Sequence, residues 1–181
     1  KQQLSLCTTT PIVAYRAGGW CLQPFDKIRT ALINNGISID STVFKQGYSD
    51  DPTRYFDFRI PQSDSPWRFS DDPLKVQHDG VFLEVPISAY KTSPFFFWKL
   101  AFVKQFSRGV MRPYGDGSAM IAHGRYYFDR LTKASHGPVM IDGVKAAQLN
   151  SALKQHQKKA QSQAIFNVMG ERYVFQHHFA H

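Results

Sequence analysis

Between positions 12 and 44, the spacing of apolar residues is first typical of a strand, then of a helix, and then of a strand again. A short apolar run at 12–15 is followed by a charged, glycine-rich turn. Apolar residues then recur every three or four positions, as on one face of a helix, at Leu22, Phe25, Ile28, Ala31 and Leu32. Gly36 stands where a left-handed helix cap is favoured, and a second apolar run covers 37–43. This order predicts a right-handed crossover between two parallel strands.

The hydrophobic pattern weakens after residue 44 and then predicts another strand. Residues 45–79 are polar and interrupted by four prolines, which predicts a long irregular excursion with one short strand at 55–60. The run at 81–87 has the character of a buried strand. Glu84 lies inside it, where it either turns to solvent on an alternating face or is held by a cation. Burial statistics favour the solvent-facing alternative.

The second half of the chain predicts more helix and another crossover. Rings and aliphatic residues at 94–106 have helical spacing, whereas 125–131 fits either a strand or helical turns. Strand candidates at 139–141 and 164–169 enclose a predicted helix at 144–161, which is a second β-α-β pattern. The expected fold class is therefore α/β, a parallel sheet with alternating helices that forms a partial or distorted (β/α) barrel.

Composition narrows the class of protein. A chain of 181 residues with 43% hydrophobic residues suits one ordinary domain, so 1–181 is expected to be a single domain. The formal charge of +8 raises the question of a polyanionic partner, but the basic residues are scattered and nucleic acid is not expected.

Two cysteines cannot form a disulfide framework or a zinc cage. No apolar run is long enough to span a bilayer, and nothing in the pattern predicts the oligomeric state.

Three segments carry polar residues at or near the ends of the predicted strands. They are Tyr15-Arg16-Ala17-Gly18-Gly19-Trp20, Gly36-Ile37-Ser38-Ile39-Asp40-Ser41-Thr42-Val43 and Phe82-Leu83-Glu84-Val85-Pro86-Ile87-Ser88. In this order and spacing the chain resembles the NodB-like polysaccharide deacetylase family from about residue 12 to 88, and more weakly from 139 to 169. The resemblance implies a deformed (β/α) barrel. It also implies a metal-dependent carbohydrate esterase, which removes acetyl groups from a polysaccharide or oligosaccharide.

The same resemblance implies roles for individual residues. Arg16 matches the third-motif arginine, which tunes the general base, and Asp40 is a polar anchor; these two are the candidate catalytic residues. Trp20, Trp67 and Glu84 are the candidate substrate-binding residues, with the tryptophans lining a sugar groove. A divalent metal, zinc by resemblance, is expected to lower the pKa of bound water and to polarise the acetyl carbonyl.

Simpler alternatives stand beside two of these roles. Arg16 is equally well explained as an arginine that closes a salt bridge to Asp40 or Asp57. An aspartate before Ser-Thr, such as Asp40, is also an ordinary turn or cap residue.

The metal and acid residues of the family are not found at their expected places. Its first two motifs, Thr-x-Asp-Asp and His-Ser/Thr-x-x-His, do not precede Arg16, so the domain is expected to lack its N-terminal part. Glu171 stands where the final histidine is expected. His177 and His181 are four residues apart, as two metal ligands on one helical face are, although a solvated tail explains them more simply. The alternative function is a non-catalytic glycan-binding domain or inactive pseudo-enzyme.

Overall fold

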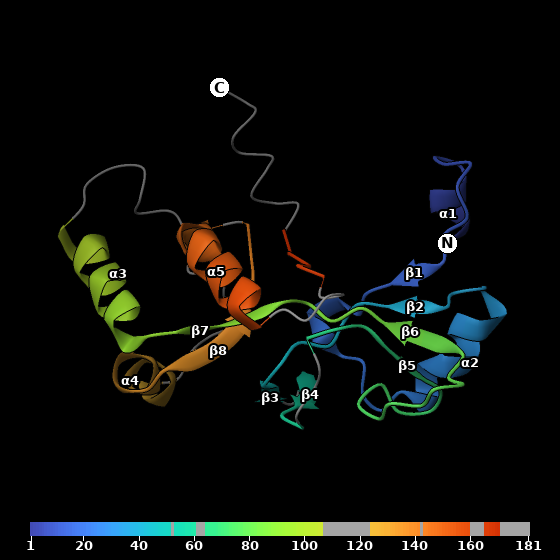
Figure 1. Cartoon of the computed structure of the whole chain (residues 1–181), viewed down its shortest axis with the longest axis horizontal. Helices are drawn as coiled ribbons and strands as arrows, with labels where there is room; N and C mark the ends of the chain where they lie inside the picture. Colours follow the sequence, from blue (N-terminus) through green and yellow to red (C-terminus); the bar gives the residue numbers. More distant parts are fainter. Residues whose placement is uncertain (52, 61–63, 107–123, 142, 160–164, 171–181) are drawn as a thin grey trace. The chain divides into compact units, whose positions relative to one another are not determined.

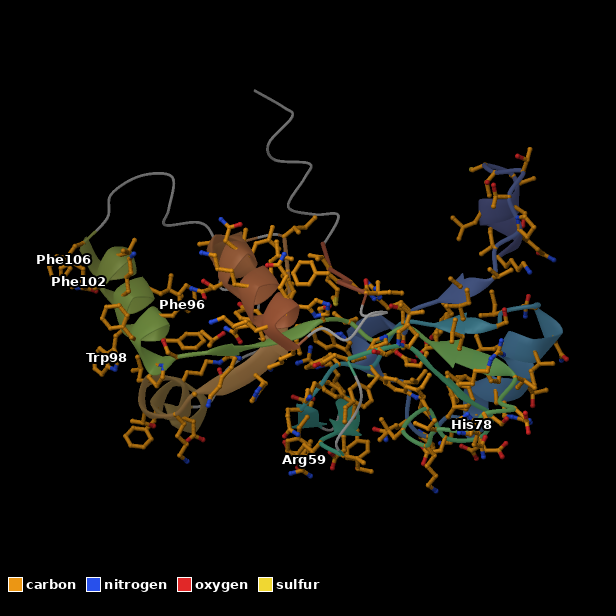
Figure 2. The ribbon with its side chains drawn as sticks, in the orientation of Figure 1. Arg59, His78, Phe96, Trp98, Phe102 and Phe106 are labelled. Atoms are coloured by element: carbon orange, nitrogen blue, oxygen red, sulfur yellow. The ribbon has the colours of Figure 1, made fainter. Side chains whose placement is uncertain are left out.

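The computed structural model describes residues 1–51, 53–60, 64–106, 124–141, 143–159 and 165–170. The chain divides into two compact units, the first formed by 1–88 with 160–167 and the second by 89–159 with 168–181. Figure 1 shows their helices and strands, and Figure 2 adds the side chains. Each unit contains its own paired strands and its own helices.

The first unit is built on a four-stranded sheet in the order β1-β2-β6-β5. Its strands are β1 (Ala14–Tyr15), β2 (Ile39–Asp40), β5 (Trp67–Phe69) and β6 (Phe82–Glu84). β2 pairs in parallel with both β1 and β6, which confirms the predicted parallel crossover, whereas β5 runs antiparallel to β6. The described strands form an open, mixed sheet and no closed barrel, so the α/β class is confirmed but the barrel is not.

The predicted helix of the first crossover is α2 (Asp26–Asn34). Gly36 follows it with φ +62°, the left-handed conformation predicted for the cap. Just before the helix, the buried Phe25 ring meets Phe69 at 5.1 Å and Phe82 at 5.2 Å between ring centroids. Aromatic contacts of this kind join the crossover to the sheet. Two short helices precede α2, α1 (Gln2–Ser5) and η1 (Gly18–Trp20).

The irregular excursion predicted at 45–79 is wrong in part, because it contains three strands. Besides β5, it forms an antiparallel hairpin of β3 (Gly47–Asp51) and β4 (Arg54–Phe58). Phe56 and Phe58 are buried in β4, while the alternate residue Tyr55 is exposed. This period of two is that of a strand with one covered face. Neither β3 nor β4 contains a proline, so the proline signal did not apply to these two strands.

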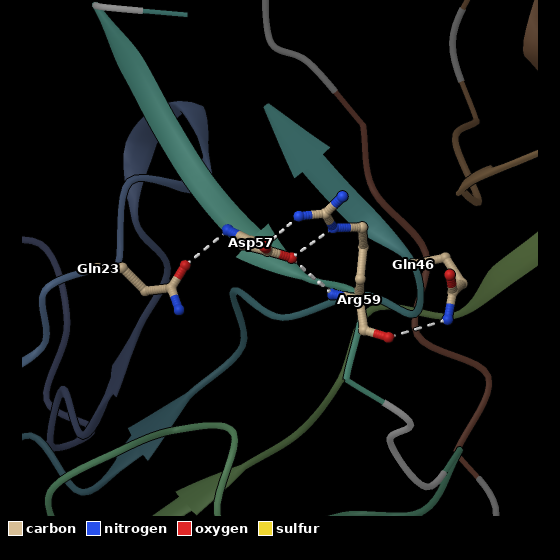
Figure 3. Close-up of polar contacts among 4 residues, drawn as sticks. All are labelled: Gln23, Gln46, Asp57 and Arg59. Carbon is tan, nitrogen blue, oxygen red and sulfur yellow. Dashed lines mark hydrogen bonds and ion pairs between the residues drawn. The ribbon is translucent and has the colours of Figure 1, made fainter. Parts of the chain in front are cut away.

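Polar contacts fix the end of this hairpin, as Figure 3 shows. Arg59 donates from Nε to Asp57 Oδ1 at 2.9 Å and from Nη2 to Asp57 Oδ2 at 2.6 Å. The Asp57 backbone N–H donates to Gln23 Oε1 at 2.7 Å, and Gln46 Nε2 donates to the Arg59 carbonyl at 3.2 Å. The hydrogen bonds from Arg59 lower the pKa of Asp57. Asp57 is therefore engaged within the hairpin.

Gly80 is required by close backbone packing. A Cβ atom at this position would lie 2.4 Å from the backbone nitrogen of the buried Phe69 and 2.5 Å from its carbonyl oxygen. We expect Gly80→Ala to lower the free energy of unfolding by about 2 kcal/mol, because paired backbone cannot yield to the new methyl group. Gly18→Ala is the matched control, since a Cβ atom there meets nothing within 4 Å. Urea unfolding followed by tryptophan fluorescence checks both, and equal midpoints would contradict the packing argument.

The second unit pairs β7 (Ala89–Thr92) with β8 (Ser135–Pro138) in an antiparallel ladder. Its helices are α3 (Pro94–Phe106), α4 (Gly124–Thr132), η2 (Gly143–Gln148) and α5 (Leu149–Lys159). The helix predicted at 94–106 is confirmed, and 125–131 proves to be helical. The helix predicted at 144–161 begins instead as the 3-10 helix η2. None of the helices in the described ranges has the length and apolarity needed to cross a membrane.

The second predicted crossover is present in reduced form. Met140 and Met169 form a parallel bridge on either side of η2 and α5. The Met169 N–H donates to the Val139 carbonyl at 3.0 Å, and the Ile141 N–H donates to the Met169 carbonyl at 2.8 Å. The two predicted strands therefore meet in parallel, but as a single bridge.

Candidate functional site at the carboxyl ends of the parallel strands

Three parallel strands bring their last residues into register at one edge of the first unit. Tyr15 of β1 pairs with Asp40 of β2, which pairs with Glu84 of β6. Arg16 directly follows β1, and Ser41 directly follows β2. In open sheets of parallel strands, ligand sites gather at this edge. The register therefore assembles two acids and an arginine that lie up to 68 positions apart in the sequence.

Asp40 and Glu84, the carboxyl pair, are both buried, with 1% and 0% of their surface exposed. Asp40 accepts hydrogen bonds from the Thr42 hydroxyl at 2.8 Å and from the Thr42 backbone N–H at 3.2 Å. Glu84 Oε1 accepts from the Val43 N–H at 3.0 Å. The solvent-facing interpretation of Glu84 is wrong, because its side chain is fully buried and turned to the Val43 backbone N–H.

Both members of the carboxyl pair have raised pKa values. Burial raises the pKa of Asp40, and it raises the pKa of Glu84 well above its ordinary value. The hydrogen bond from Glu84 to Asp40 and the charge of Asp40 raise the pKa of Glu84 further. Glu84 Oε2 is buried without a hydrogen-bond partner among the described groups, which also disfavours a negative charge on it. The pair therefore carries less negative charge than two free carboxylates.

Arg16 is held by neutral oxygen atoms. Its Nε donates to the Ser41 carbonyl at 2.7 Å, and its Nη2 donates to the Ser41 hydroxyl at 2.9 Å and to Asn167 Oδ1 at 3.3 Å. Asn167 Nδ2 in turn donates to the Ser41 hydroxyl at 2.8 Å and to the carbonyl groups of Val85 and Pro86, each at 3.2 Å. Ser41 and Asn167 thus orient the guanidinium plane from two directions.

The salt bridge considered for Arg16 is not formed. Within the described residues, none of the ion pairs closer than 4.0 Å includes Arg16, and Asp57 is paired with Arg59. Asp40 influences Arg16 through space and directs its own oxygen atoms to Thr42 and Glu84. The positive charge of Arg16 is consequently available at the strand ends.

Asn167 is a site residue that the sequence analysis missed. Its backbone N–H donates to the Ser88 hydroxyl at 2.9 Å, and the Ser88 N–H donates to the Asn167 carbonyl at 3.0 Å. These two bonds fix Asn167 beside the residues that follow β6. The one available signal was a polar amide within the apolar run 164–169, where a buried polar group needs partners.

The two tryptophans predicted to line a groove lie in different surroundings. Trp67 is 5% exposed, and its Nε1 donates to the Pro73 carbonyl at 2.9 Å, so its ring belongs to the core of the first unit. Trp20 is half-buried, with ring centroids 5.4 Å from Phe44 and 5.7 Å from Phe56. Of the two, Trp20 has more surface left for a ligand.

The part of the chain that the structure describes offers no group that fits the divalent metal implied by the resemblance. His177 and His181 lie outside the described residues. Across the described ranges, no group of three or more His, Cys, Asp or Glu side chains could hold a metal ion. The carboxyl pair offers two acids whose pKa values burial raises, whereas metal ligands must be deprotonated. We therefore assign no chemical step to a metal.

Comparisons with known proteins found no relative of this chain. Models of protein families, curated proteins and solved structures all gave no match to this chain. The resemblance to the deacetylase family remains a prediction, and a proposal about function must start from Arg16 and its surroundings.

Proposed function

We propose that this chain is a carbohydrate esterase domain that acts on acetyl groups of a polysaccharide or oligosaccharide, with Arg16 as the charged residue of its site. The observation that supports this best is the setting of Arg16. Its guanidinium lies at the carboxyl ends of parallel strands, oriented by Ser41 and Asn167 and not paired with any described acid within 4.0 Å.

The chemistry of acetyl transfer needs such a charge. Attack on an acetyl ester or amide places negative charge on the carbonyl oxygen, and a general base must stay deprotonated at the working pH. A fixed guanidinium serves the first need, since it stabilises the oxyanion, whereas Asp40 and Glu84 beside it have raised pKa values and are not proposed as the base. Because Ser41 and Asn167 already orient Arg16, little reorganisation is needed during the reaction.

The carboxyl pair behind Arg16 supports the same function. Two ionised acids would offset the positive charge of Arg16, whereas acids with raised pKa values are less readily ionised and offset it less. The role proposed for Glu84 is therefore to leave the positive charge of Arg16 largely uncompensated. Because Glu84 is buried, it has no surface for direct contact with a sugar. This replaces the substrate-binding role that the resemblance implied for Glu84.

Acetate release from acetylated glycans tests the proposal. The chain is incubated with acetylated chitin oligosaccharides and with acetylated xylan, in the presence of added zinc and, separately, of a chelator. We expect acetate to be released from at least one glycan. A folded chain that releases no acetate under any of these conditions would exclude the esterase.

A non-catalytic glycan-binding domain is the second candidate, and Trp20 favours it. Half-buried rings stack well on sugars, and Trp20 follows Arg16 by four residues in the turn after β1. In this case the chain binds the oligosaccharide without releasing acetate, and a chelator leaves binding unchanged. Trp20→Ala should then weaken binding about tenfold, the loss of roughly one ring contact. Calorimetric titration distinguishes this outcome from the esterase.

A further inference from the structure

Helix α3 presents a row of ring side chains on one exposed side, which we call the aromatic face. It consists of Phe95, Trp98, Phe102 and Phe106, spaced by three, four and four residues, so all four point to the same side of the helix. Each has between 57% and 76% of its surface exposed. In Figure 2, Trp98, Phe102 and Phe106 extend outward from the helix, whereas Phe96 lies on its other side.

The second unit holds α3 through contacts that include one member of the aromatic face. Trp98 Nε1 donates to the Leu131 carbonyl at 2.9 Å, and the Arg130 guanidinium lies 4.9 Å from the centroid of the Phe97 ring. The Phe102 and Phe106 rings contact each other at 4.5 Å, and Phe128 of α4 is also 64% exposed. No part of the described chain covers the aromatic face. Exposed apolar surface of this extent marks an interaction site.

The charge of the chain is concentrated in the same unit. Thirteen of the 22 Lys and Arg residues, but only four of the 14 Asp and Glu residues, lie in 89–159 and 168–181. That range carries a formal charge of +9, whereas the remainder of the chain carries −1. Helix α3 itself contains Lys99 and Lys104 and no acid, and the acid of α4, Asp129, is paired with Lys133 at 3.0 Å. The partner of this face is therefore expected to be anionic.

Charge and ring content together favour one kind of partner. A second copy of the chain would bring two strongly basic units together, which like-charge repulsion opposes. Single-stranded nucleic acid stacks on aromatic residues that alternate with basic ones along a groove, whereas here the rings form an uninterrupted row on a convex helix. An exposed row of Phe and Trp side chains, in a unit whose formal charge is +9, is suited to the surface of an anionic membrane.

We propose that α3 is a membrane-surface helix that places its aromatic face at the headgroup boundary of an anionic phospholipid bilayer. The basic residues of the second unit attract the bilayer, and the four rings enter it. This inference goes beyond the proposed function, because it would bring the domain to a membrane whatever its action on glycans.

Co-sedimentation with vesicles tests this inference. The full chain is mixed with vesicles of phosphatidylcholine and with vesicles of equal parts phosphatidylcholine and phosphatidylserine. We expect binding to the mixed vesicles that weakens with added salt, and little binding to phosphatidylcholine alone. The double variant Phe102→Ser, Phe106→Ser should lose about 100-fold in affinity, since two rings no longer leave water. Both residues are exposed, so circular dichroism should show unchanged folding.

Val76→Ser is the matched control, because Val76 is 60% exposed in the first unit and should not contact lipid. No binding to either kind of vesicle would overturn the proposal. Self-association that the double variant abolishes, without vesicle binding, would assign the face to a second copy. Binding to single-stranded DNA that the double variant abolishes, again without vesicle binding, would assign it to nucleic acid.

Discussion

Replacing Arg16 by lysine is expected to lower kcat/KM for acetate release by about 100-fold, the usual effect of removing one preorganised donor to a developing oxyanion. Lysine keeps the charge but cannot reproduce the planar fork that contacts Ser41 and Asn167. Because Arg16 is exposed, the melting temperature should change little. Initial rates at several substrate concentrations, measured beside thermal unfolding, give both quantities.

Arg59→Lys provides the matched control for this prediction. Arg59 is also exposed and also forms a forked contact, but with Asp57 in the hairpin and not at the strand ends. Its replacement should leave kcat/KM within about twofold, as expected for an exposed ion pair away from the reaction. Equal rates for wild type and Arg16→Lys would show that Arg16 only links Ser41 to Asn167.

Replacing Glu84 by alanine is expected to lower the free energy of unfolding by about 3 kcal/mol. The change leaves a cavity where the buried Glu84 side chain lay and leaves the buried Val43 N–H without its acceptor. Glu84→Gln should be tolerated, since its amide oxygen can accept from Val43 and its amide nitrogen can donate to Asp40. Urea unfolding at pH 7 of the three proteins measures this difference.

The pH dependence of stability gives a separate test of the carboxyl pair. Both pKa values are raised in the folded protein, so protons bind more tightly to the folded than to the unfolded chain. Their contribution is fully present below the unfolded pKa values, near pH 4, and is lost as the pH rises through the folded ones. The wild type should therefore lose stability relative to Glu84→Gln as the pH rises from about 5 to 8. A constant difference over this range would mean that Glu84 is ionised throughout.

The first crossover could be predicted from local sequence patterns, because a strand, a helix and a helix cap are each indicated by residues within about ten positions of one another. The spacing of apolar residues located α2, and Gly36 marked its end. The hairpin was missed because prolines on its flanks suggested irregular structure, although Phe56 and Phe58 already had the period of a strand. The antiparallel strand β5 depends on pairing with β6, which no local pattern reveals.

The candidate site was predictable only in its separate parts. Arg16 and Asp40 stand at strand ends that the sequence could locate. The environment of Glu84 depends on its register with Asp40, 44 positions away, so a strand with an isolated acid looked solvent-facing. Asn167 reaches Ser41 across 126 positions, a contact set by the tertiary fold. Contacts at this separation decide which polar groups are buried and satisfied, and hence their charge.

If Arg16 directs a reaction at the acetyl groups of a glycan, its replacement should spare those groups. The mass of an acetylated oligosaccharide is measured after incubation with wild-type chain, with Arg16→Lys and with Arg59→Lys. We expect loss of acetyl groups with the wild type and Arg59→Lys, and a large reduction of that loss with Arg16→Lys. Unchanged mass with the folded wild type, or equal loss with all three proteins, would show that Arg16 does not direct such a reaction.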